Sequence, residues 1–174
     1  EIGVRLVGSE MCIRDRNKIA SFLVDHTKLI PGLYISRKDD FGFDKITTFD
    51  MRITTPNIEP AMDTDGLHAI EHLGATFLRN DLQWSSKIIY FGPMGCRTGF
   101  YLIICGDLYP LDIYNLVTDM CEYILHFEGA IPGASSIECG NYLDLNLDKA
   151  KKYIQMYKQE VLNHFTKEHY VYPE

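Results

Sequence analysis

The amino-acid sequence predicts an α+β fold in a single domain. Segments with the two-residue period of a β-strand are mixed with segments whose apolar residues recur at helical spacing, and no segment repeats another. The chain has 174 residues, of which 46% are hydrophobic; this is enough for one domain with a substantial core but short for two. No internal linker is visible, so we expect residues 17–174 to form one domain.

The first 16 residues, "EIGVRLVGSEMCIRDR", follow neither period and do not have the layout of a secretory signal. The stretch "SEMCIRDR" within them is typical of translated adapter sequence joined to a truncated gene. We therefore interpret residues 1–16 as a non-native or disordered N-terminal segment and leave them out of the fold prediction. Cys12 accordingly receives no functional role.

The first regular elements expected along the chain are a strand and a helix. In residues 45–54, "KITTFDMRIT", the side chains of Phe49, Met51 and Ile53 alternate with polar ones, which predicts a strand with one apolar face. The turn-forming "TPN" ends this strand. Residues 66–80 predict a helix, because apolar residues recur there at helical spacing. These residues are Leu67, Ile70, Leu73 and Phe77.

Two short strands and two helices are expected further along the chain. "KIIYF" (87–91) and "GFYLIIC" (99–105) are apolar runs separated by the turn-prone "GPMG", a pattern typical of buried strands. Residues 110–127 begin with proline, as helices often do, and continue amphipathically. A loop rich in Gly, Pro and Ser occupies 128–136. Residues 147–165 then place an apolar stripe on one side of a last helix.

Charge and cysteine content narrow the functional classes. The formal net charge of -7 argues against a general nucleic-acid partner, which usually requires a basic face. No apolar run approaches the roughly 18 residues needed to cross a bilayer, so we expect no membrane partner. The five cysteines are odd in number and lack a C-x-x-C pair, which with no secretory signal suits a reducing cytoplasm. We expect Cys105 and Cys121 to belong to the core.

The helix predicted over 66–80 carries the motif "HAIEH". With about 3.6 residues per turn, His68 and His72 lie about 40° apart on one helix face, where both can bind a single metal ion. Glu71 falls beside them and is free to move protons, as in the H-x-x-E-H arrangement. The motif alone also fits two unrelated surface histidines. Three further histidines match no motif and receive no role: His126, His164 and His169.

Two cysteine-containing segments favour the metal interpretation. Cys96 lies in "GPMGCRTGFY", a glycine-flanked turn that exposes the thiol, and Arg97 or a nearby metal would favour its thiolate. Cys139 lies in "ECGNY", directly after the flexible loop. A third metal ligand is commonly distant in sequence, and sets of Cys and His suit zinc or ferrous iron. Two imidazoles and one thiolate would leave an open coordination position, which is the layout of a catalytic site.

Five motifs, which follow one another in the order that the family shows, make the sequence resemble the LuxS family, the S-ribosylhomocysteine lyases of autoinducer-2 production. The resemblance covers the chain from about Ser21 to the C-terminus. It implies a mostly antiparallel sheet packed against about three to four helices. The motifs are "SFLVDHTKL" (21–29), "TTFDMRITTPN" (47–57), "GLHAIEHLGATFLRN" (66–80), "IIYFGPMGCRTGFY" (88–101) and "ECGNY" (138–142).

The resemblance implies a role for nine residues. The expected metal ligands are His68, His72 and Cys139. The expected acid/base groups are Glu71 and Cys96. The expected substrate-binding residues are Ser21, His26, Arg52 and Arg79. One Fe2+ per subunit is implied, with Zn2+ or Co2+ as substitutes, in a homodimer whose sites lie at the subunit interface.

The reaction implied by the resemblance explains these residue types. S-Ribosylhomocysteine carries a thioether at C5 of its sugar, which is eliminated once a carbonyl stands at C3. The C1 carbonyl must therefore move to C2 and then to C3, which requires two acid/base groups and a Lewis acid. The products are homocysteine, returned to the methyl cycle, and 4,5-dihydroxy-2,3-pentanedione, the autoinducer-2 precursor in quorum sensing.

Two other kinds of function remain open at this stage. One is a metallopeptidase of the H-x-x-E-H type, in which Glu71 would activate a metal-bound water; such enzymes are usually longer and take an acidic third ligand. The other is a non-enzymatic binding module stabilised by a metal. Neither explains a cysteine at position 96 in its exposed turn. The sequence departs from the family pattern at Ala69-Ile70, where neither side chain is expected to face the metal. It also departs at Tyr90-Phe91, before the Cys96 turn, which leaves pocket detail open there.

Overall fold

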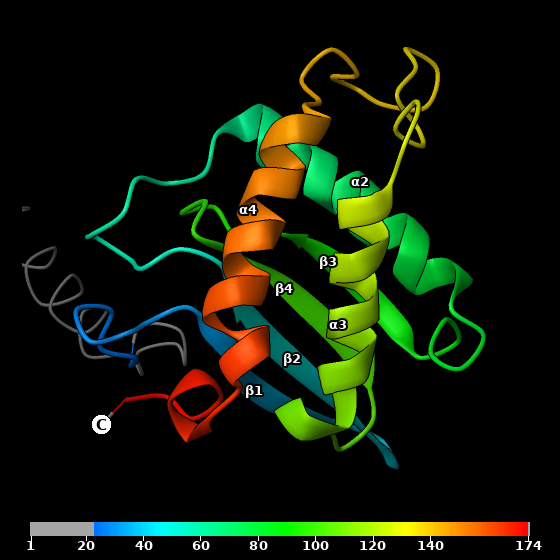
Figure 1. Cartoon of the computed structure of the whole chain (residues 1–174). Helices are drawn as coiled ribbons and strands as arrows, with labels where there is room; N and C mark the ends of the chain where they lie inside the picture. The colour runs from blue at the N-terminus through cyan, green and yellow to red at the C-terminus, as the bar shows by residue number, and fades with distance from the viewer. Residues whose placement is uncertain (1–22, 174) are drawn as a thin grey trace, which may run out of the picture.

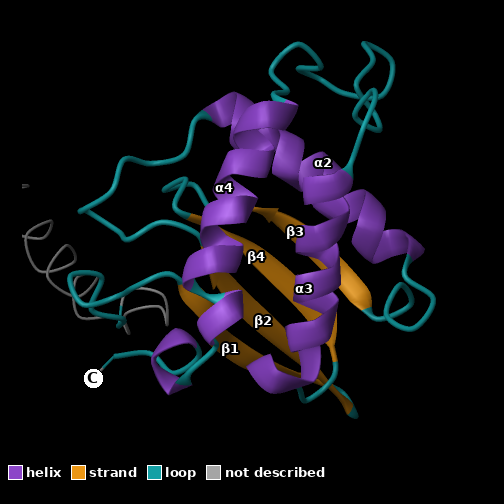
Figure 2. Ribbon diagram, viewed as in Figure 1, coloured by secondary structure: helices purple, strands orange, loops and turns teal. Residues whose placement is uncertain are grey.

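A computed structural model describes residues 23–173 of the chain, so the N-terminal segment 1–16 lies outside the described residues. One four-stranded antiparallel sheet forms the centre of the fold, in the order β1-β2-β4-β3. Three α-helices gather on one face of this sheet (Figures 1 and 2). The strands are β1 (Gly32–Phe41), β2 (Asp44–Arg52), β3 (Ile88–Pro93) and β4 (Gly99–Cys105). The helices are α2 (Thr64–Asn80), α3 (Pro110–His126) and α4 (Leu147–Glu160).

The predicted α+β class is confirmed, and most predicted elements lie within two residues of their observed bounds. β4 occupies the predicted range 99–105, and β2 begins one residue before the predicted strand 45–54 and ends two before its end. α2 starts two residues before the predicted helix 66–80. These segments were predictable because each buries one side, strands against the helices and α2 against the sheet. Burial on one side makes the apolar residues recur with the period of the element. Among the described residues, no helix is long and apolar enough to span a membrane.

β1 was not predicted from the sequence. Its second half, "RKDDF", is highly charged and exposed, and a register irregularity between Ile35 and Arg37 breaks the two-residue period. β1 forms because its backbone pairs with β2 through a tight turn at Gly42, whose φ of 66° suits glycine. An edge strand rich in charge is also a common protection against edge-to-edge pairing.

The last predicted helix, 147–165, is corrected at its C-terminal end. α4 stops at Glu160, and a short 3-10 turn, η2 (Leu162–His164), follows it. Val161 and Leu162 are still buried, so the apolar stripe extends beyond the α-helix and concealed its end in the sequence. The hydroxyl of Tyr114 on α3 donates to the carbonyl of Leu162 (2.8 Å), which satisfies a backbone group freed by this change.

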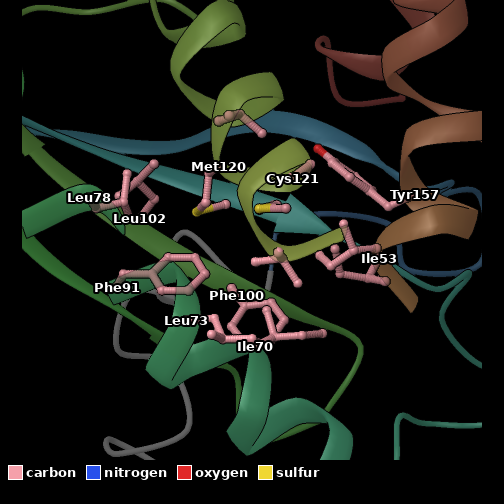
Figure 3. Packing of buried hydrophobic residues seen from close by; sticks show 14 of the residues in the cluster. Ile53, Ile70, Leu73, Leu78, Phe91, Phe100, Leu102, Met120, Cys121 and Tyr157 are labelled. Carbon is pink, nitrogen blue, oxygen red and sulfur yellow. The ribbon is translucent and has the colours of Figure 1, made fainter. Parts of the chain in front are cut away.

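The hydrophobic core fills the space between the sheet and the helices (Figure 3). Because Phe49 pairs with Leu102 and Met51 with Phe100, the apolar side chains of β2 and β4 share the face that the helices cover. The three helices contribute fully buried side chains to the other side of this core. They include Ile70 and Leu73 of α2, Val117, Met120 and Cys121 of α3, and Ile154 and Tyr157 of α4.

The two cysteines expected in the core differ in their surroundings. Cys121 is fully buried, and burial raises the pKa of its thiol, so the neutral form is maintained. Cys105 pairs with Ile46 and is only half-buried, on the face of the sheet away from the helices. The prediction for Cys105 was therefore wrong, because an apolar run in a strand does not reveal that only one face of its sheet is covered.

Leu102→Ala should lower the free energy of unfolding by about 2–5 kcal/mol, because it leaves a cavity between β4 and the helices. Urea denaturation followed by circular dichroism measures this change. Leu82 is fully exposed after α2, so Leu82→Ala is the matched control and should change stability by less than about 0.5 kcal/mol. A loss at position 102 no larger than at position 82 would contradict the placement of β4 in the core.

Candidate metal centre and its surroundings

Three side chains from two distant parts of the sequence converge at one place. α2 places His68 and His72 one turn apart, with their ring centroids 4.6 Å from each other. The segment between α3 and α4, which we call the Cys139 loop (residues 127–146), brings Cys139 Sγ to 3.5 Å from His68 Nε2. One ligand atom from each of the three residues lies within 4.8 Å of the others. Such a group of half-buried nitrogen and sulfur donors can hold a metal ion.

Backbone carbonyls of the Cys139 loop orient both imidazoles. Nδ1 of His68 lies 2.8 Å from the carbonyl oxygen of Asp144, and Nδ1 of His72 lies 2.7 Å from that of Pro132. A carbonyl only accepts, so each ring donates its proton from Nδ1. Nε2 is then the unprotonated nitrogen on both rings, which is the form that binds a metal. The donor chemistry therefore fits a divalent ion.

Gly133 permits the close approach of the loop to His72. A Cβ atom at this position would lie only 3.1 Å from His72 Nδ1, and the backbone has a φ of +75°. Both conditions disfavour any other residue. The run "AIPGASS" is therefore more than a flexible connection, because its Pro132 carbonyl and Gly133 backbone form one wall of the site.

Polar contacts anchor the other end of the Cys139 loop to the start of α2. Asn146 donates from its backbone to the carbonyl of Asp65 (2.9 Å) and from its side chain to the Asp65 carboxylate (3.1 Å). Lys149 on α4 forms ion pairs with both Asp63 and Asp65, at 2.9 Å each. These contacts hold the beginning of α2, the end of the loop and the beginning of α4 together.

Cys96 lies at the turn between β3 and β4. Its Sγ is 3.1 Å from the hydroxyl of Thr98 and 3.7 Å from Nη1 of Arg52. Burial raises the pKa of the Cys96 thiol, but the hydrogen bonds of Thr98 and the positive charge of Arg52 outweigh this effect. The pKa of Cys96 consequently lies below its ordinary value, as is typical of a reactive cysteine. Arg97, which the sequence suggested as the neighbouring cation, is exposed and makes no such contact.

Arg52 is held in a buried polar cluster. Its Nη2 donates to Asp50 Oδ2 at 2.6 Å, and its Nη1 donates to Thr98 Oγ1 at 2.5 Å. Only 3% of Arg52 and 2% of Asp50 are exposed. Within residues 23–173, Arg52 Nε and Asp50 Oδ1 have no hydrogen-bond partner. Native structures leave few buried polar groups unsatisfied, so these two unpartnered atoms are an unusual feature of the cluster.

The turn that carries Cys96 is connected to the beginning of α2. The backbone N–H of Met62 donates to the carbonyl of Arg97 (2.9 Å), two residues before α2 begins. Arg97 has a φ of 58°, in the left-handed region that a tight turn requires. The same end of α2 therefore contacts both the Cys139 loop and the Cys96 turn.

The other predicted residues lie at various places relative to the three donors. Glu71 is half-buried between the two histidines on α2. His26 lies before β1, with Nδ1 2.9 Å from the carbonyl of Val24. Arg79 lies at the opposite end of α2, about 16 Å along the helix from His68, and donates to the carbonyl of Ile89 (2.9 Å). Ser21 lies outside the described residues.

Sequence reasoning did not select Asp50 or Thr98. Asp50 and Arg52 are two apart on β2, so they share the face away from the helices. A charged pair at this spacing in a strand is a signal that could have been read. Thr98 carried no such signal, because its hydroxyl meets Arg52 only through the pairing of β2 with β4, in which Arg52 stands opposite Gly99.

The fold and the site together define a class of protein: an α+β protein with a His-His-Cys group that can hold a metal and a separate thiol of lowered pKa. Comparison with known proteins identifies the family. The family described as S-Ribosylhomocysteinase (LuxS) matches residues 19–168. This chain belongs to the LuxS family, which is a family of metalloenzymes.

Curated relatives match nearly the whole chain. A protein of Finegoldia magna is 56% identical over 158 residues, which cover 91% of this chain and 99% of the relative. A protein of Clostridium beijerinckii is 53% identical, with 90% and 98% covered. One of Borreliella burgdorferi is 54% identical, with 90% and 99% covered. All three are named S-ribosylhomocysteine lyase.

Thr98→Val should raise the pKa of Cys96, since it removes the hydroxyl that contacts both Cys96 Sγ and Arg52. The rate at which iodoacetamide modifies Cys96, followed by peptide mass spectrometry from pH 5 to 10, reports this pKa. The mutant profile should shift to higher pH, so modification is slower below the wild-type pKa and equal well above both values. Thr118→Val, on α3, is the control; its hydroxyl bonds only the carbonyl of Tyr114. An unshifted Thr98→Val profile would overturn this assignment.

Proposed function

We propose that this chain cleaves S-ribosylhomocysteine to homocysteine and 4,5-dihydroxy-2,3-pentanedione, the precursor of autoinducer-2. The name of its curated relatives, which cover about nine tenths of the chain, supports this substrate. The observation that carries the proposal is the convergence of His68, His72 and Cys139 in a chain that belongs to this family. The Cys96 thiol of lowered pKa adds the acid/base chemistry that this reaction needs.

His68, His72 and Cys139 are the proposed metal ligands, with one Fe2+ per subunit and Zn2+ or Co2+ as substitutes. The free Nε2 atoms and the nearby Sγ support this assignment. When bound, the ion would supply a Lewis acid that stabilises negative charge on the sugar oxygens. Two carbonyl contacts to Nδ1 keep both rings in the ligating tautomer throughout.

Glu71 and Cys96 are the proposed proton carriers. Moving the carbonyl from C1 to C2 and then to C3 removes a proton from one carbon and returns one to its neighbour at each shift. In the last step a proton leaves C4, the C5–S bond breaks, and the sulfur of homocysteine takes up a proton. The lowered pKa of the Cys96 thiol favours proton exchange, and Arg52 stabilises its thiolate. Glu71, beside the two histidines, is the second carrier.

The substrate pocket is proposed to include Ser21, His26, Arg52 and Arg79. Arg52 also contacts the proposed proton carrier Cys96, whose Sγ lies 3.7 Å from its Nη1. Arg79 lies about 10 Å along α2 from His72, and its guanidinium donates to the carbonyl of Ile89 on β3, so it is engaged away from the three donors of its own chain. We therefore propose a homodimer in which Arg79 serves the site of the other subunit.

The face of the sheet opposite the helices supports such a dimer. Ile89 and Tyr90 are more than two-fifths exposed, and Tyr101 and Ile103 on the adjacent β4 are half-buried. Exposed apolar side chains in neighbouring strands are typical of a protein–protein interface. We also propose a cytoplasmic location, because the four described cysteines are all free thiols. No observation favours the metallopeptidase alternative, and its usual acidic third ligand is replaced here by Cys139.

Glu71→Gln and Cys96→Ala should each abolish most thiol release from S-ribosylhomocysteine, by about 100-fold or more, because each removes a proton carrier. Ellman's reagent measures the released homocysteine. Metal content, determined on anaerobically purified protein, should be retained in both variants. Undiminished turnover in either variant would contradict its assigned role.

Variants of the proposed metal ligands should differ from the Glu71 and Cys96 variants in their metal content. His72→Ala and Cys139→Ala should lose both metal and activity, since each removes one of three donors. His126→Ala is the matched control, because His126 is exposed at the end of α3. Full metal content in the Cys139→Ala protein would show that the ion is held elsewhere.

Co-expression of two inactive subunits tests the shared site. If Arg79 serves the partner's site, a heterodimer of Arg79→Ala and Glu71→Gln subunits contains one intact site and one doubly altered site. Random pairing should then restore about a quarter of wild-type activity, since half of the dimers are mixed and each has one working site. If Arg79 serves its own subunit, the mixture stays as inactive as its components, and the proposed arrangement is wrong.

A further inference from the structure

The C-terminal tail (residues 165–173) reaches the face of the sheet that the helices leave uncovered. Its 3-10 turn η3 (Lys167–His169) contacts β1, and Figure 1 shows the tail beside the β1 end of the sheet. The hydroxyl of Tyr34 lies 3.1 Å from the carbonyl of Glu168 in this turn. Three residues beyond the turn, the ring of Tyr172 stacks on that of Tyr34, with centroids 4.7 Å apart and planes 11° from parallel. The tail is therefore held in place by packing as well as by hydrogen bonding.

Tyr172 ends this tail against the buried charge pair. Its hydroxyl donates to Asp50 Oδ2 at 2.9 Å, the same oxygen that accepts from Arg52 Nη2. Asp50 Oδ1 has no partner among the described residues, so Tyr172 and Arg52 provide all the hydrogen bonds of this carboxylate there. The polar chain therefore runs from Tyr172 through Asp50 and Arg52 to Cys96.

Strand pairing determines which groups face this chain of contacts. Tyr34 on β1, Asp50 on β2 and Tyr101 on β4 stand side by side across the sheet. Burial, followed by the charge of Asp50, raises the pKa of Tyr172, Tyr34 and Tyr101 alike. Tyr172 therefore stays protonated and remains a donor at every pH at which the protein functions.

A donor on the far side of Asp50 affects Arg52 in two ways. The donor fixes the position of the Asp50 carboxylate, and the carboxylate in turn fixes the Arg52 guanidinium. Nη1 of this guanidinium contacts Thr98 and Cys96. The Tyr172 hydroxyl also shares the carboxylate oxygen that pairs with Arg52. Asp50 therefore neutralises less of the positive charge of Arg52, and the attraction of Arg52 for the Cys96 thiolate is stronger. Both effects favour the ionised form of Cys96.

We propose that Tyr172 is a positioning residue for the reaction: through Asp50 it holds Arg52 against Cys96 and so keeps the Cys96 thiolate available. The proposal rests on the proposed function, in which Cys96 carries protons. It assigns a catalytic consequence to the C-terminal tail, although Tyr172 itself does not touch the thiol.

Tyr172→Phe removes the hydroxyl and keeps the ring that stacks on Tyr34. Iodoacetamide modification of Cys96 in the metal-loaded protein, without substrate, measures the fraction of thiolate as a function of pH. We expect the Cys96 profile to move up by about half a pH unit, which slows modification about threefold below the wild-type pKa and leaves it unchanged well above it. The kcat for thiol release near neutral pH should fall by a similar factor, with KM little changed.

Tyr170→Phe is the matched control. Tyr170 lies in the same tail, but its ring packs against Phe165, with centroids 5.3 Å apart. This variant should keep the wild-type profile and kcat. Tyr172→Ala, which also removes the stacking, should shift the profile at least as far as Tyr172→Phe; a melting temperature measured alongside identifies any general loss of structure.

The outcomes separate this inference from the proposed function. An unshifted Cys96 profile in folded Tyr172→Phe protein overturns the positioning role, whatever happens to turnover. A change in melting temperature alone, with kcat and the profile unaltered, overturns it as well. If Cys96→Ala retains turnover, the proposed function fails, and the substrate-free modification profile still decides whether Tyr172 controls the thiol.

Discussion

Two hydrogen bonds from helix α2 to the Cys139 loop are the constraint on which the candidate metal centre depends. His68 and His72 each donate from Nδ1 to a loop carbonyl, those of Asp144 and Pro132. Each of these two contacts orients an imidazole, selects its tautomer and positions the adjoining part of the loop. Since Cys139 lies between the two carbonyl groups along the chain, both ends of its surrounding loop are held to the helix that carries the other donors.

The sheet separates two kinds of environment. Its helix-covered face is an apolar core in which β2 and β4 present Phe49, Met51 and Leu102. The other face buries a charged pair, Asp50 and Arg52, beneath the C-terminal tail. A buried ion pair contributes little to stability by itself, because desolvation offsets much of the attraction. Its position beside Cys96 therefore suggests a functional reason for retaining it.

Elements with a regular apolar period were predictable, and those held by long-range pairing were not. α2 and β4 each bury one side against a single layer, so their period was visible in the sequence. β1 has a broken period and forms through pairing with β2. At the site, His68 and His72 could be paired from helix geometry alone, whereas the contact of Thr98 with Arg52 exists only because β2 and β4 are neighbours.

The sequence by itself determined the fold class, the two-histidine face of α2 and the motifs that the LuxS family shares, because these depend on local period and residue order. Tertiary structure decided that Cys139 meets the histidines, that Arg52 and not Arg97 faces Cys96, and that Tyr172 reaches Asp50. These contacts join residues between 44 and 122 positions apart. Their formation depends on loop paths and strand order, which no local pattern of side chains encodes.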